Sequence, residues 1–151
     1  MVGKTMQIPL YSSIELGYLT GAIDIQGIIG IEKLKKKGTG RKFYRCRLRI
    51  NTKRKKILSY LKKTFRISRK ITRGTYSRKG FEINMNSHKE IKRILLLVRS
   101  YLIENKKQAE FMLGYIRYRE SLPPITKGSS WRKIKGKTNY SWTDVFSFRY
   151  S

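Results

Sequence analysis

The sequence predicts an α+β domain, and three observations support this fold class. Residues 12–26 have the apolar spacing of a helix, two later pairs of segments alternate apolar and polar side chains as hairpin strands do, and an amphipathic helical pattern follows each pair. The predicted order is therefore α-β-β-α-β-β-α with one additional helix, over residues 12–120. A basic and aromatic tail follows at residues 121–151.

The first predicted helix has a clear start signal and two unfavourable features. Ser12 and Glu15 have the three-residue offset of a capping box. Gly17 and Gly21 each cost about 1 kcal/mol relative to alanine inside a helix, and close approach of another backbone is the usual compensation. Asp24 lies in the last turn, where the helix dipole disfavours an anion. A helix that departs from two local rules over so few residues is a candidate functional element.

The next elements follow from hydrophobic periodicity. Strands are predicted at residues 28–35 and 42–52, joined by a hairpin loop at 36–41. A helix is predicted at 53–65 and a second hairpin over 70–86. Two helices complete the domain, one starting after Ser87 and one over residues 105–120. The second strand has an apolar face of Tyr44, Cys46, Leu48 and Ile50 and a basic face of Arg45, Arg47 and Arg49.

The composition indicates a folded binder of polyanions. Lys and Arg number 36 against 9 Asp and Glu, a formal net charge of +27, and 39% of the residues are hydrophobic. Nucleic acid is the simplest partner for such a chain. The single cysteine (Cys46) and single histidine (His88) exclude an internal disulfide, a cysteine zinc site and a histidine cluster. With neither a signal peptide nor an apolar run of about 18 residues, an intracellular location is expected.

Residues 19–27, Leu-Thr-Gly-Ala-Ile-Asp-Ile-Gln-Gly, carry a motif that resembles the LAGLIDADG sequence at its positions 1, 3, 5, 6 and 9. Residues 101–109, where a lysine precedes Gln-Ala, are similar to a later signature of the same family. The chain therefore resembles the LAGLIDADG homing endonucleases over about residues 12–120. This resemblance implies the family's α+β fold with an antiparallel four-stranded DNA-binding saddle.

The motif occurs once, and the resemblance to single-motif members implies a homodimer with a near-palindromic double-stranded DNA target. The two motif helices would form the interface, with Gly17, Thr20, Gly21 and Asp24 of each subunit in contact. The resemblance further implies an intron-encoded protein of an archaeal cytoplasm or of an organelle (mitochondrion or chloroplast).

The resemblance also implies the chemistry, which is Mg²⁺-dependent hydrolysis of both DNA strands. Arg54 would stabilise phosphate charge, Asn51 or Thr52 would hold the water network, and Lys106 would be the late-signature lysine unless Asn105 takes its place. The metal would lie by Gln26 and the backbone carbonyl of Ile25. The residues expected to face DNA, unless they form an ordinary solvated sheet face, are Lys33, Lys35, Arg45, Arg47, Arg49, Arg73, Tyr76 and Arg78.

Gln26 departs from the family pattern, because it stands at motif position 8, where the family has its metal-binding acid. A neutral amide is a poor ligand for a hard divalent cation, so this chain is expected to bind DNA and to cut it slowly or not at all. Three explanations stay open: an engineered Glu-to-Gln replacement, a natural loss of cleavage, or sufficient activity with Gln26 and backbone carbonyls.

The rival function is a non-cleaving nucleic-acid binder, such as a maturase that assists splicing of intron RNA, and a ribosome-associated RNA-binding protein is a third class. The tail at 121–151 would either lie along phosphates or dock its aromatic side chains on the core.

Overall fold

The computed structural model describes residues 10–74 and 80–122. The predicted basic and aromatic tail lies almost entirely outside these residues. The predicted α+β order is confirmed, and the elements are α1 (Ser13–Gln26), β1 (Gly27–Lys35), β2 (Lys42–Thr52), α2 (Lys55–Thr64), β3 (Thr72–Arg73), β4 (Phe81–Met85), α3 (His88–Val98) and α4 (Lys106–Ser121).

The helix boundaries follow from local hydrogen bonds. At α1 the predicted capping box is present, because the Ser12 hydroxyl accepts from the Glu15 N–H and the Glu15 carboxylate accepts from the Ser12 N–H, both at 3.1 Å. Helix α2 begins at Lys55, two residues later than predicted. The reason is that Arg54 has an extended backbone and donates its N–H to the Thr52 hydroxyl.

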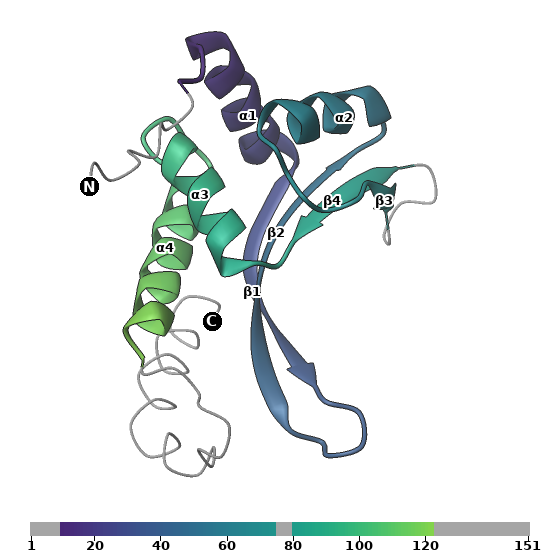
Figure 1. The fold of residues 1–151 in the computed structure, drawn as a ribbon, viewed down its shortest axis with the longest axis vertical. Coiled ribbons are helices and arrows are strands. Elements are labelled where there is room, and N and C mark those ends of the chain that lie inside the picture. The colour runs from purple at the N-terminus through teal and green to yellow at the C-terminus, as the bar shows by residue number, and fades with distance from the viewer. Residues whose placement is uncertain (1–9, 75–79, 123–151) are drawn as a thin grey trace, which may run out of the picture. The chain divides into compact units, whose positions relative to one another are not determined.

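The four strands form one antiparallel sheet in the order β1-β2-β4-β3. Strand β3 begins at Thr72, two residues after the predicted start of the second hairpin, and residues 75–79 of that hairpin lie outside the described residues. The β1–β2 hairpin is the longest part of the sheet and extends beyond the helices (Figure 1).

One face of the sheet packs against the helices and forms the core. Helices α1, α2 and α3 all contact β2. The fully buried side chains include Cys46, Leu48 and Ile50 of β2, Ile83 and Met85 of β4, Leu19 and Ile23 of α1, Leu58 and Leu61 of α2, Phe65 after α2, Ile91, Ile94, Leu95 and Val98 of α3, and Ala109 and Ile116 of α4. No described helix is long and apolar enough to span a bilayer.

Helices α3 and α4 lie side by side and antiparallel (Figure 1). The rings of His88, at the start of α3, and Tyr115, late in α4, have centroids 6.3 Å apart. At the other end, Arg99 makes a two-pronged ion pair with Glu110 at 3.0 Å. His88, the only histidine, thus contributes to helix packing.

Candidate nucleic-acid interface and motif site

The motif residues form the junction at which α1 passes directly into β1. Gly27 has an extended backbone, with φ −89° and ψ 146°, and its N–H donates to the Ile23 carbonyl. A Cβ at Gly27 would lie 2.3 Å from that carbonyl oxygen, far inside van der Waals contact. Motif position 9 is therefore glycine because of space at the junction and not because of a left-handed backbone.

Asp24 joins the end of α1 to the start of α4. Its Oδ2 accepts from the Ile103 N–H at 2.8 Å and its Oδ1 from the Asn105 N–H at 3.0 Å. In return, the Asn105 side-chain amide donates to the Ile23 carbonyl at 2.8 Å. The carboxylate thus lies at the positive end of the α4 dipole, which offsets its unfavourable place in the last turn of α1.

Three of the predicted catalytic residues lie on segments that meet at this junction. Gln26 is half-buried at the end of α1, and Ile50 pairs with Gly27, so Asn51 follows directly beside the junction. The Asn51 Oδ1 is buried and has no hydrogen-bond partner among the described residues. The contacts of Asp24 bring the first residue of α4, Lys106, to the same end of α1.

Arg54 takes a different position. It is exposed at the N-cap of α2, where it lines a shallow hollow with Tyr18, Lys55, Lys56 and Ile57. The aromatic rings of Tyr18 and Tyr60, 5.1 Å apart, join α1 to α2 beside this hollow.

The side chains at the junction do not fit the divalent metal that the resemblance implies. Gln26 offers only a neutral amide, and both oxygens of Asp24 are engaged by backbone N–H groups. Among the described residues, no three His, Cys, Asp or Glu side chains lie close enough to hold a metal ion. A hard cation such as Mg²⁺ prefers carboxylate ligands, and residues 10–74 and 80–122 offer no free carboxylate at the junction.

The strand register separates the predicted DNA-facing residues onto two faces. Glu32 pairs with Arg45 and Gly30 with Arg47, whereas Lys33 pairs with Tyr44. Partners in an antiparallel pair project to the same face, so the arginines of β2 project from the face away from the core, here called the arginine face.

Two of the lysines expected to face DNA lie on the opposite face of the sheet from the arginines. Lys33 and Lys35 belong to the same face as Cys46, and the Lys33 ammonium lies 5.9 Å from the centre of the Tyr44 ring. Both lysines are exposed because the hairpin extends past the helices. Arg73 pairs with Phe81 and likewise lies on the other face. The predicted contacts of Tyr76 and Arg78 lie outside the described residues.

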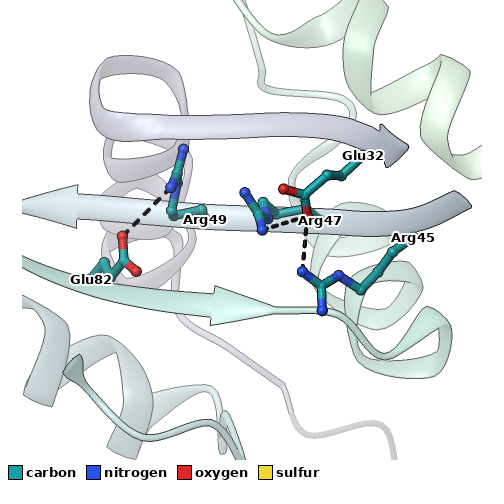
Figure 2. Close-up of polar contacts among 5 residues, drawn as sticks. All are labelled: Glu32, Arg45, Arg47, Arg49 and Glu82. Atoms are coloured by element: carbon teal, nitrogen blue, oxygen red, sulfur yellow. Dashed lines mark hydrogen bonds and ion pairs between the residues drawn. The ribbon is translucent and has the colours of Figure 1, made fainter. Parts of the chain in front are cut away.

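Two glutamates neutralise most of the arginine face. Glu32 Oε2 accepts from Arg45 at 2.9 Å and from Arg47 at 2.5 Å (Figure 2). The hydrogen bond from Arg45 is the main cause that lowers the pKa of Glu32, with the charge of Arg47 adding to it against desolvation. The carboxylate therefore stays ionised at neutral pH and holds both guanidinium groups.

Arg49 is paired more deeply. Its Nη1 lies 3.7 Å from Glu82 Oε2, and the two side chains are only 8% and 7% exposed. This buried ion pair corrects the expectation that Arg49 lies open on the sheet surface. The three arginines and two glutamates of Figure 2 together carry a net charge of +1, so the centre of the sheet is far less basic than the chain as a whole.

Of the predicted interface residues of α1, some are open at the surface and others are engaged within the chain. Within the described residues, a Cβ added at Gly17 or Gly21 would meet no atom within 4 Å other than the backbone of its own helix, so this side of the helix is open. Thr20 is instead buried within its own chain and donates its hydroxyl to the Leu16 carbonyl. Asp24 is engaged by α4, so the two glycines are the interface residues that remain available.

Sequence reasoning missed Glu32 and Glu82. For Glu32 a signal was present, since the loop at 36–41 places Lys35 opposite Lys42 and therefore Glu32 opposite Arg45. The pairing of Arg49 with Glu82 depends on β2 lying next to β4, which the sequence does not state.

No protein-family model matches the chain, and no curated protein matches it in sequence. Solved structures do match. The homing endonuclease I-CvuI, bound to an uncleaved DNA target in the presence of magnesium, superposes with a TM-score of 0.62 at 16% identity, covering 72% of this chain and 69% of that one. The intron-encoded homing endonuclease I-CeuI, complexed with DNA, gives 0.62 at 13% identity, covering 74% and 58%.

A third similar structure is the LAGLIDADG homing endonuclease I-GzeII with its DNA target. Its TM-score is 0.56 at 23% identity, over 72% of this chain and 38% of that one. These likenesses agree with the element order, the antiparallel sheet and the motif junction at Gly27. The helix that ends on the sheet at its motif glycine and these structural matches together show that this chain has the fold of the LAGLIDADG homing endonucleases.

Proposed function

We propose that this chain is a DNA-binding subunit of the LAGLIDADG homing endonuclease type, intron-encoded and specific for one duplex site. The observation that carries the proposal is the α1–β1 junction, where the motif residues form a helix that ends on the sheet and where Gly27 has no room for a Cβ. Two strands of an antiparallel sheet fit the major groove of B-DNA. The similar structures named above were solved with DNA.

The residues of the junction support binding of duplex DNA without efficient cleavage. Gln26 lacks the charge of a metal-binding acid, and Asp24 cannot replace it without giving up its hydrogen bonds to α4. In active members of the family, magnesium at this position would lower the pKa of the attacking water and neutralise charge on the phosphate. With Gln26, the side chains in place position the duplex but provide no anionic ligand for that ion.

We also propose that the binding unit is a homodimer formed through α1. Ile14, Tyr18 and Ile25 are 81%, 46% and 84% exposed, and with Gly17 and Gly21 they follow one stripe of the helix. Apolar side chains around small residues favour close packing of two helices, and a two-fold pair of motif helices would read a near-palindromic site. Gly21→Leu is expected to leave the monomer folded and to dissociate the dimer in analytical ultracentrifugation.

The deciding experiment compares this chain with Gln26→Glu on a library of near-palindromic duplexes in magnesium, measuring binding and cleavage separately. Both forms are expected to bind the same duplexes, with affinity falling steeply as salt rises because many phosphates are neutralised. Only the Gln26→Glu form is expected to cut at a measurable rate. If neither form binds any duplex of the library more tightly than a duplex of random sequence, the proposed function is wrong.

A second candidate is a non-cleaving binder such as an intron RNA maturase, and Gln26 is the observation that favours it. It predicts tight binding of structured RNA and no cleavage by either form. Including a structured intron RNA as competitor separates the two candidates. The maturase replaces the endonuclease proposal if the RNA displaces duplex DNA and Gln26→Glu remains inactive.

A further inference from the structure

We propose that Glu32 determines sequence specificity, by holding Arg45 and Arg47 toward guanine while its free oxygen accepts a hydrogen bond from cytosine, so that this cluster selects G·C base pairs. The inference rests on the proposed function, because it concerns the duplex that the same sheet would bind. Glu32 is an anionic residue on a surface expected to meet DNA, and G·C pairs are the base pairs that it would read.

The geometry of the cluster provides both parts of this role. Glu32 lies directly opposite Arg45 in the register, and Arg47 is the next residue of β2 on the same face. A single oxygen, Oε2, accepts from both guanidinium groups. The second oxygen, Oε1, accepts no hydrogen bond from the described part of the chain. The side chains of Arg45 and Glu32 are 37% and 32% exposed, so both are partly open at the surface of the sheet.

The order of donors and acceptors matches one kind of base pair. Guanine presents two acceptors, N7 and O6, to the major groove, and arginine binds them together, whereas cytosine presents the N4 donor, which a carboxylate accepts. A cluster of two arginines around one glutamate can thus satisfy the edges of G·C pairs. Thymine presents the O4 acceptor at the same place, which would repel the carboxylate and leave it desolvated and unpaired.

Glu32 also affects binding to DNA of any other sequence. DNA phosphates repel a carboxylate, and arginines that are paired with it attract the phosphate backbone of the DNA less strongly. It should therefore weaken non-specific binding while it reduces the conformational freedom that Arg45 and Arg47 lose on binding the right site. Both effects raise the ratio of specific to non-specific affinity.

The second ion pair of the arginine face does not have this role. The side chains of Arg49 and Glu82 are less than a tenth exposed, so neither can reach a base edge without leaving its place between the strands. The specificity role is accordingly assigned to Glu32 with Arg45 and Arg47, and the Arg49–Glu82 pair serves to hold β2 against β4.

The test uses the full chain, the Glu32→Gln variant and the matched control Glu110→Gln. Glu110 also pairs with an arginine and its loss changes the net charge equally, but it lies on α4, away from the sheet. Each protein is used to select binders from randomised duplexes, and its affinities for the selected and for a random duplex are measured over a range of salt. Thermal melting verifies that all three are folded.

The unaltered chain is expected to select G·C pairs at fixed positions of each half-site. Glu32→Gln should lose about 5- to 100-fold of the discrimination at those positions and bind random duplex more tightly, with a steeper salt dependence. Glu110→Gln should behave as the unaltered chain. If Glu32→Gln selects the same sequences with the same affinity ratio as Glu110→Gln, the inference is overturned while the proposed function stands. If the unaltered chain selects no duplex, the proposed function fails and the inference fails with it.

Discussion

The Asp24→Ala substitution would test the contact between the two ends of the motif region. It removes the acceptors of two backbone N–H groups, those of Ile103 and Asn105, at 2.8 and 3.0 Å. It leaves the third contact, from the Asn105 amide to the Ile23 carbonyl, in place. The segment that leads into α4 would then lack both these hydrogen bonds and the negative charge that complements the α4 dipole.

The expected loss of stability can be estimated from these contacts. Replacing a capping side chain by alanine costs about 0.5–2 kcal/mol, and a hydrogen bond to a charged acceptor contributes about 1.5–3 kcal/mol. Asp24 is only half-buried, so after its removal water will hydrogen-bond in part to the N–H groups of Ile103 and Asn105. Two bonds at this site should therefore contribute about 2–3 kcal/mol together. For a domain of this size the melting temperature should fall by roughly 5–10 °C.

The assay is urea unfolding followed by circular dichroism, at two protein concentrations. The control is Glu104→Gln, which removes a charge at the same helix start without removing a hydrogen bond. Its effect should stay below about 1 kcal/mol, the range of a helix-dipole interaction. If Asp24→Ala costs no more than this control, the contact does not stabilise the fold as argued. A loss that vanishes at high protein concentration would instead assign Asp24 to the dimer interface.

Two further predictions concern buried parts of the domain. Gly27→Ala should destabilise the fold by about 2 kcal/mol or more, because its Cβ would lie 2.3 Å from the Ile23 carbonyl oxygen. Gly30→Ala, which has open space around its Cβ, should cost less than half of that in the same unfolding assay. Equal losses for the two variants would refute the steric reason. Burial raises the pKa of the Cys46 thiol to about 12, so it should resist thiol reagents at pH 8 in the native chain and react when unfolded. Between about pH 9 and 12, the unfolded chain releases this proton and the native chain keeps it, so stability should fall as pH rises, and a Cys46→Ala variant should lack that part of the slope.

The elements with strong local signals were predicted well. The capping box of Ser12 and Glu15, the end of α1 at Gly27 and the β1–β2 hairpin all depend on residues close together in the chain. The expectation that Lys33 faces DNA together with the arginines rested on charge, whereas the register sets Lys33 opposite Tyr44 on the other face. Strand β3 starts at Thr72 and not at residue 70, because its pairing with Glu82 and Phe81 of β4, and not its own sequence, decides where it begins.

The sequence by itself determined the α+β order, the resemblance of residues 19–27 to the motif and the substitution of its acid by Gln26, because each is written in local spacing or in residue identity. Only the tertiary structure decided where the remaining charges act. Asp24 meets Ile103 and Asn105 across about eighty residues, and Arg49 meets Glu82 only because β2 lies beside β4. A carboxylate's role depends on which donors surround it, and those donors come from strands and helices that only folding brings together.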